Sequence, residues 1–195
     1  MANVFAIHSV CSSIATFLQN TYPVSSGGQP MPACTFEVLS SNQMAGTQDD
    51  NNRVSLYLYR VTVNEHSRHQ RPGRMPQANP APLGLDLHIM LSAWSGSAMD
   101  EQVALAWTIR QLHLYPILDA SSLSPEPAWS ADEVIQVVPA ELSTEDIMRI
   151  WDALEPSYRL SVSYIARMVR LDPDLMSEAR PVVATRWDYG SEART

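Results

Sequence analysis

The feature that most constrains this chain is a long alternation of side chains over residues 83–94, with the sequence LGLDLHIMLSAW. Every odd position is apolar, whereas the even positions are Gly, Asp, His, Met, Ser and Trp. Successive side chains of a strand point to opposite faces, so a period of two predicts a strand with one buried face. The rest of the fold is expected to be built around this strand.

Two other segments alternate in the same way. Residues 54–63 are rich in β-branched and aromatic side chains and should pair with residues 83–94. The last strand, residues 158–171, has one face formed by Leu160, Val162, Tyr164, Ala166 and Met168. Shorter strands are predicted around residues 36–39 and at residues 134–138, where Pro139 would end the strand.

Apolar residues at intervals of three and four predict three helices. The first spans residues 3–20 with Asn3 as its cap, and the third begins at a capping box formed by Ser143 and Asp146. The second has Asp100 and Glu101 in its first turn and is stopped by Pro116, and its apolar side is made of Val103, Ala106, Trp107, Ile109 and Leu112. Together these elements predict an α+β fold, a mixed and largely antiparallel sheet packed against about three helices.

Length and composition narrow the class of protein. A chain of 195 residues fits one domain, predicted here as residues 1–172, with residues 173–195 as a C-terminal tail or extension. The net charge of −8 disfavours binding to nucleic acid or to anionic membranes. Neither a signal peptide nor a membrane span is evident, and Cys11 and Cys34 are expected to be reduced thiols, so synthesis and assembly in the cytoplasm are expected.

The one strong charge asymmetry is a cluster of five arginines between Arg53 and Arg74, with Glu65 as its only acid. Part of it lies in the proline-rich segment between the two central strands. It is either a solvated surface or a docking surface for acidic or carbonyl-rich partner edges. Arg167 on the last strand and two aromatic residues of the tail could add to such an interface. The candidate interface residues are Arg60, Arg68, Arg71, Arg74, Arg167, Trp187 and Tyr189.

No arrangement of residues points clearly to catalysis. Phosphate-binding glycine loops and the G-x-S-x-G elbow are absent from the sequence. A metal site formed by His66 and His69 with His88 or His113, or an acid–base pair of Asp86 and His88, can be drawn but has weak support. We therefore predict no catalytic, cofactor-binding or metal-binding residues.

The order of several segments resembles a known family. These are Val54–Val61 followed by Asn64 and Arg68, the strand Leu83–Trp94, and the later segments Leu112–Leu118, Ile150–Leu154 and Tyr158–Tyr164. Over residues 4–172 the chain is similar to the N-terminal domain family of the cap, or tail terminator, protein of extracellular contractile injection systems. The resemblance implies a fold like phage tail terminators, a homo-hexameric ring, and capping of the inner tube and contractile sheath at the end distal to the baseplate.

A terminator must match the last ring of a polymer on one surface and offer no repeat of that surface on the other. The edge of the last strand, or the tail after Asp172, could add to a sheath strand, and the arginines could line the ring or meet the tube. Two alternatives stay open: a monomeric adaptor that links a particle component or cargo, and a metal-dependent enzyme.

Overall fold

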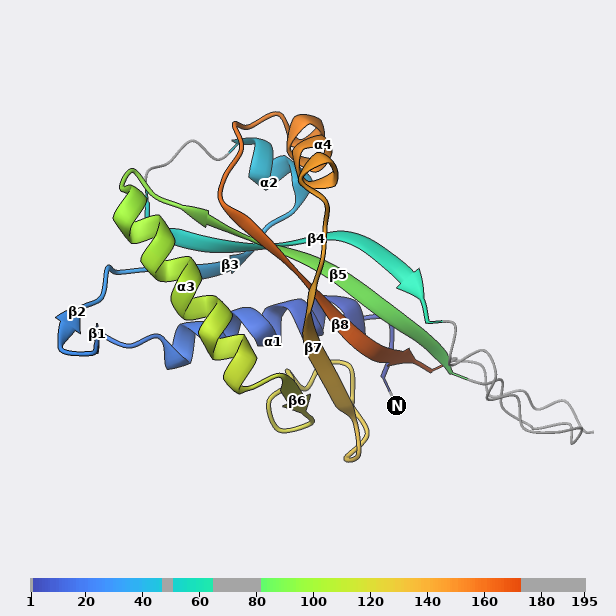
Figure 1. Cartoon of the computed structure of the whole chain (residues 1–195). Helices are drawn as coiled ribbons and strands as arrows, with labels where there is room; N and C mark the ends of the chain where they lie inside the picture. The colour runs from blue at the N-terminus through green and yellow to red at the C-terminus, as the bar shows by residue number, and fades with distance from the viewer. Residues whose placement is uncertain (1, 47–50, 65–81, 173–195) are drawn as a thin grey trace, which may run out of the picture.

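The computed structural model describes residues 2–46, 51–64 and 82–172. Within these ranges the chain forms a six-stranded sheet in the order β3-β4-β5-β8-β7-β6, together with a small separate hairpin (Figure 1). The strands of the sheet are β3 (Thr35–Val38), β4 (Arg53–Val63), β5 (Leu83–Trp94), β6 (Ile117–Asp119), β7 (Val134–Ala140) and β8 (Ser161–Leu171). The hairpin consists of β1 (Ser25–Ser26) and β2 (Gln29–Pro30). The helices are α1 (Ala6–Thr21), α2 (Ser41–Gly46), α3 (Ala98–Leu114) and α4 (Thr144–Leu154).

The predicted α+β class is confirmed. Only the β3–β4 pair is parallel, and the other pairs of the sheet are antiparallel. Figure 1 shows α1 and α3 on one side of the sheet and α2 and α4 on the other. The short helix α2 was not predicted, so the structure has one helix more than expected within the described ranges. None of these helices is long and apolar enough to cross a membrane.

The central strand β5 pairs with β4 on one side and with β8 on the other. The predicted alternation holds from Leu85 to His88, because Leu85 and Leu87 are buried while Asp86 and His88 are partly exposed. It fails at the start of the strand, where Leu83 is 45% exposed and Gly84 is buried. In its second half both faces are buried, and Met90, Ser92 and Trp94 are at most 1% exposed. The expectation of one buried face is therefore wrong for this half, because α4 and α2 cover the face that the pattern leaves to solvent.

The helices α1 and α3 build the main core on the opposite face. In α1 the buried side chains include Val10, Ile14 and Leu18. This helix begins at Ala6 rather than Asn3, whose Oδ1 instead accepts a hydrogen bond from the Phe5 N–H in the preceding turn (2.9 Å). Val4, placed on the apolar face by the pattern, is accordingly 71% exposed.

The orientation of α3 differs from the prediction. Its cap at Ser97 and the acidic residues of its first turn fit the expected start. However, the buried side is formed by Ala104, Leu105, Trp107, Thr108 and Leu112. Val103, Ala106 and Ile109 were expected inside but are partly or fully exposed, because α3 carries apolar residues on two sides and only one of them can face the sheet.

Two β-bulges change which side chains face the core. In β8, Arg167 and Met168 together stand opposite Asp86, and Met168 has a positive φ of 67°. The bulge inserts one extra residue and shifts the alternation of side chains after it. Val169 is therefore buried in place of Met168, and the prediction that Met168 shares a face with Tyr164 and Ala166 is wrong. In β4 the register shifts between Leu58 and Arg60.

The edges of the sheet also differ from the prediction. The sequence analysis proposed that β8 has an exposed edge to which a partner strand could add. In the structure β8 lies inside the sheet between β5 and β7, so neither of its edges is free where it pairs with these strands. The edge strands of the described sheet are β3 and β6. Pro139 does not end β7, which continues to Ala140. Pro139 pairs with Tyr164 of β8, but its nitrogen faces the other side, as does the Val137 N–H that donates to the Pro116 carbonyl (2.7 Å). On that side β6 pairs only with residues 134–136, so no neighbouring strand needs the missing N–H of the proline.

Candidate interface on the open face of the sheet

The sheet face opposite α1 and α3 has two differently protected regions. Under α2 and α4, which we call the covered half, Trp94, Trp151 and Met44 form a second apolar cluster. Beyond α4 lies the open half, a set of polar side chains on the same strands. The open half consists of Arg60 and Thr62 on β4, Asp86 and His88 on β5, and Arg167 on β8.

The register of the strands brings the open half together. Arg60 is the cross-strand partner of His88, and Thr62 is the partner of Asp86. Arg167 belongs to the bulge opposite Asp86. Both arginines are exposed, while the three shorter side chains are partly buried between them. The structure therefore places two of the predicted interface residues, Arg60 and Arg167, on one surface.

Hydrogen bonds fix the shorter side chains of this surface. The Asp86 carboxylate accepts hydrogen bonds from Asn64 Nδ2 (3.0 and 2.9 Å) and from the Met168 backbone N–H (3.2 Å). His88 Nε2 lies 3.1 Å from Thr62 Oγ1. The bonds of Asp86 and His88 thus lead to different neighbours, which does not favour their proposed action as an acid–base pair.

The two arginines act on the same imidazole. The pKa of His88 is lowered from 6.5, first by burial and then by the positive charge of Arg60. Arg167 lowers this pKa further, whereas the Asp86 carboxylate raises it. A histidine that is held neutral between two guanidinium groups leaves the arginines as the cationic groups of the surface. Guanidinium groups form paired hydrogen bonds with carboxylates and also bind carbonyl oxygens, so this surface can receive an acidic or carbonyl-rich edge.

A groove borders the open half where α4 approaches β4. It has a volume of about 420 Å³ and is lined by Tyr59 and Arg60 from the sheet and by Arg149, Ile150 and Ala153 from the helix, among others. Tyr59 is fixed by a 2.9 Å hydrogen bond between its hydroxyl and that of Ser163. The groove gives a partner a place to insert a side chain beside Arg60.

Several predicted site residues lie outside the described residues. These are His66, Arg68, His69, Arg71, Arg74, Trp187 and Tyr189. Among the residues that the structure describes, no three His, Cys, Asp or Glu side chains gather as a metal-binding group. Cys11 and Cys34 are buried free thiols, and burial raises the pKa of each to about 12. Raised thiol pKa values disfavour reactive thiolates at these positions.

The sequence prediction did not include Thr62 in this surface, and it left Tyr59 open between a plain strand-face aromatic and a docking residue. The signal was the break in the alternation at Tyr59-Arg60, where the apolar side chains change from even to odd positions. That break marks the bulge of β4, and bulges commonly re-aim side chains next to functional sites.

Comparison with known proteins supports the fold. Residues 9–185 match the model of the family described as the Pvc16 N-terminal domain. The structure is similar to the PVC sheath/tube terminator in the extended state, from an extracellular contractile injection system, with a TM-score of 0.52 and 17% identity over 98% of this chain and 65% of that chain. It is also similar to the tube-terminating cap of the anti-feeding prophage, with a TM-score of 0.54 and 13% identity over 97% of this chain and 62% of that one.

These similarities confirm the predicted terminator-like fold. The chain spans less than two thirds of the length of either solved protein. No curated protein sequence matches it.

Proposed function

The chain belongs to the Pvc16 N-terminal domain family, and we therefore propose that it is a structural cap subunit of a contractile injection particle. In this role it ends growth of the inner tube and the contractile sheath at the end distal to the baseplate. The solved proteins that share its fold are a sheath/tube terminator and a tube-terminating cap, which supports a structural rather than an enzymatic role.

The observation that carries the proposal is the asymmetry of the two sheet faces. One face is closed by α1 and α3, whereas the other leaves Arg60 and Arg167 on an open surface. A terminator needs one surface that binds the last ring and a different surface beyond it, because a repeated surface would let the polymer grow. We assign the open half to contact with an acidic or carbonyl-rich edge of a tube or sheath subunit.

The remaining partners follow from the same role. We propose that the chain assembles as a homo-hexameric ring around the tube. Arg68, Arg71, Arg74, Trp187 and Tyr189 stay candidates for contacts within this ring or with tube and sheath. The proposed domain of residues 1–172 would carry the binding surfaces, and the particle would be assembled in the cytoplasm before its release. No nucleic acid or cofactor takes part in this function.

Electron microscopy of particles from producing cells tests the proposal. Without the gene we expect overlong, ragged or disassembled tubes and sheaths, and with it a six-fold ring at the distal end. Particles with normal ends in its absence would contradict the cap function. A normal particle lacking a six-fold ring at this chain's position would instead support the monomeric adaptor.

Charge reversal tests the surface. The double variant Arg60→Glu, Arg167→Glu should reproduce the loss of defined ends, because repulsion replaces attraction at the contact. Arg110→Glu is the matched control, since Arg110 is also an exposed arginine but lies on α3, on the opposite side of the sheet (Figure 1). If the double variant caps as well as the control does, the open half is not the contact surface.

A further inference from the structure

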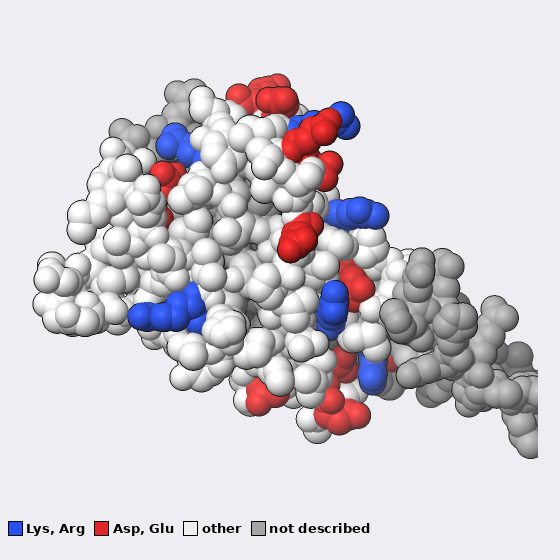
Figure 2. All heavy atoms as spheres, in the orientation of Figure 1, with Lys and Arg blue, Asp and Glu red and all other residues white. Residues whose placement is uncertain are grey.

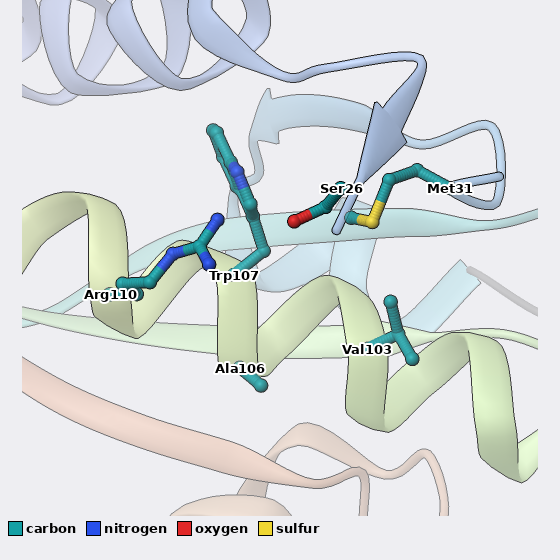
Figure 3. A pocket seen from close by; sticks show the side chains of 6 residues that line it. All are labelled: Ser26, Met31, Val103, Ala106, Trp107 and Arg110. Carbon is teal, nitrogen blue, oxygen red and sulfur yellow. The ribbon is translucent and has the colours of Figure 1, made fainter. Parts of the chain in front are cut away.

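A second docking surface lies on the helix-covered side of the sheet. There α3 and the β1–β2 hairpin enclose an apolar slot of about 280 Å³, lined by Ser26, Met31, Val103, Ala106, Trp107 and Arg110 (Figure 3). We propose that this slot binds a segment of another protein that carries a large apolar side chain next to a carboxylate. The proposal does not depend on the cap function, because the slot and the open half are on opposite sides of the sheet.

One wall of the slot is rigid. Trp107 is 5% exposed. The centre of its ring lies 4.8 Å from the centre of the Tyr22 ring, in an edge-on arrangement, and 5.9 Å from the centre of the Phe36 ring. Val103 and Ala106 lie on neighbouring turns of the same helix and face away from the sheet core. A helix with this many fixed aromatic contacts offers a preformed surface, which lowers the entropy lost on binding.

The opposite wall is lightly held. The hairpin has two residues in each strand and turns at Gly27 and Gly28, whose φ angles are 59° and 80°. The chain that enters and leaves the hairpin is joined by one backbone hydrogen bond, in which the Met31 N–H donates to the Val24 carbonyl (2.9 Å). Met31 supplies the apolar surface of this wall, and methionine adapts its shape to different partners. A rigid wall opposite an adaptable one suits an inserted side chain of variable shape.

The charge at the slot defines the partner. Arg110 is exposed and makes no hydrogen bond or ion pair within the described part of the chain, and it lines the slot together with Trp107 (Figure 3). Figure 2 shows the surface over α3 and the hairpin as largely uncharged, in contrast to the acidic groups around α4. A single unpaired guanidinium group beside an apolar slot favours a carboxylate and disfavours a cation.

The surface extends beyond the slot. Met99, one turn before Val103 on the same helix, is 72% exposed, and Val103 and Ala106 continue this row of apolar side chains. Apolar side chains exposed along one helix favour contact with another protein when polar residues border them. The partner is therefore a peptide segment rather than a small anion, since an anion would leave these side chains uncovered.

Two short peptides test the proposal on the full chain. The probes are acetyl-Gly-Ser-Phe-Asp-Ser-Gly-amide and the same peptide with Lys in place of Asp, and the readouts are the NMR signals of the Met31 methyl group and the Trp107 indole N–H. We expect both signals to move on addition of the Asp peptide, with roughly tenfold weaker binding of the Lys peptide. Absence of shifts with the Asp peptide, or equal binding of both peptides, overturns the proposal.

Variants separate charge from shape. Arg110→Gln should remove the preference for the Asp peptide, whereas Arg149→Gln, an exposed arginine on α4, should leave it unchanged. Ala106→Trp should block both peptides by filling the slot, and this exposed helix position tolerates a large side chain. Circular dichroism confirms that each variant is folded. An unchanged preference in Arg110→Gln contradicts the assigned partner.

Discussion

The covered half and the open half belong to the same face of the same three strands, yet they are stabilised in different ways. In the covered half, rows of side chains across β4, β5 and β8 are buried beneath α2 and α4. In the open half, the two bulges interrupt the ladder and the side chains remain accessible. The difference shows that bulges and a covering helix, rather than alternation alone, decide which part of a sheet face is available to a partner.

The covered half buries serine hydroxyls and indole N–H groups that form hydrogen bonds with one another. Ser55, Ser92 and Ser161 form a row across the strands. Two tryptophans use this row, because the Trp94 Nε1–H donates to Ser55 Oγ (2.8 Å) and the Trp151 Nε1–H donates to Ser161 Oγ (3.2 Å). Buried indole N–H groups need such acceptors, so serine is required here despite complete burial.

A row of planar side chains lies at the end of the covered half. The guanidinium carbons of Arg53 and Arg159 are 5.4 and 5.2 Å from the centre of the Trp94 ring. Buried nitrogens of these arginines, Nε and Nη2 of Arg53 and Nε of Arg159, have no hydrogen-bond partner among the described residues. Arg53 also lies near a carboxylate, with its Nη1 3.9 Å from Glu37 Oε2. Both guanidinium groups contact the indole ring through cation–π contacts, which strengthen when the groups are desolvated.

The largest predicted effect is that of Trp94→Ala. This change removes a side chain that is 1% exposed, its ring contact with Trp151 and the surface on which two guanidinium groups stack. We expect a loss of about 3–5 kcal/mol in the free energy of unfolding, measured by urea denaturation.

The matched control for Trp94→Ala is His88→Ala, on the same strand and the same face but in the open half. It should cost about 1 kcal/mol or less, because the site is partly exposed and no covering helix is lost. If both variants lose equal stability, the two halves do not differ in the way described here.

A smaller effect is expected for Ser161→Ala. The change leaves the Trp151 Nε1–H without its acceptor and removes the 2.9 Å hydrogen bond to the Ser92 hydroxyl. A buried donor without a partner costs about 1–3 kcal/mol, measured in the same way. Ser157→Ala, at an exposed position close in sequence, should stay within about 0.5 kcal/mol of the original protein. A loss no larger than that of this control would show that water replaces the serine.

Much of the fold could be predicted because its strongest signals are local. The alternation at residues 83–94 identifies the central strand. Ser143 caps its helix as predicted, since its Oγ accepts a 3.1 Å bond from the Asp146 N–H, while the Asp146 carboxylate accepts from the Ser143 hydroxyl (2.7 Å). The positions that failed depend on contacts distant in sequence. Ser55 and Ser92 alternate like solvent-facing residues, and only the packing of α4 shows that they are buried.

The site was harder to predict than the fold. Arg60 and Arg167 could be singled out by residue type, but their meeting on one surface depends on strand order and on two bulges, and of these only the β4 bulge coincides with a break in the sequence alternation. Met168 illustrates the difficulty: its position in the alternation assigns it to the core, while a positive φ in the bulge turns Val169 inward instead. The slot beside α3 was missed because its apolar residues on that helix, Val103, Ala106 and Trp107, were assigned to the core.

The charge of the open half predicts a pH effect that the covered half lacks. Because the folded pKa of His88 lies below 6.5, protons bind more readily to this histidine in the unfolded chain. As the pH falls through 6.5 and towards the folded pKa, the contribution of His88 therefore lowers stability, and His88→Gln should remove this part of the pH dependence. An NMR titration of the imidazole should show its pKa rising in Arg60→Gln. An unchanged pKa would mean that Arg60 does not act on this site.

The smallest effect is expected on the outer surface of α4, the helix that closes the covered half. Arg149 Nη2 and Glu145 Oε1 are 2.6 Å apart, but both side chains are more than 70% exposed. A double-mutant cycle with Glu145→Gln and Arg149→Gln should therefore give a coupling of only about 0.3–0.5 kcal/mol, decreasing with added salt. A coupling above about 1 kcal/mol would mean that surface charges help to hold α4 in place. The expected small value, against the large loss in Trp94→Ala, would show that the helix closes this half through its buried face alone.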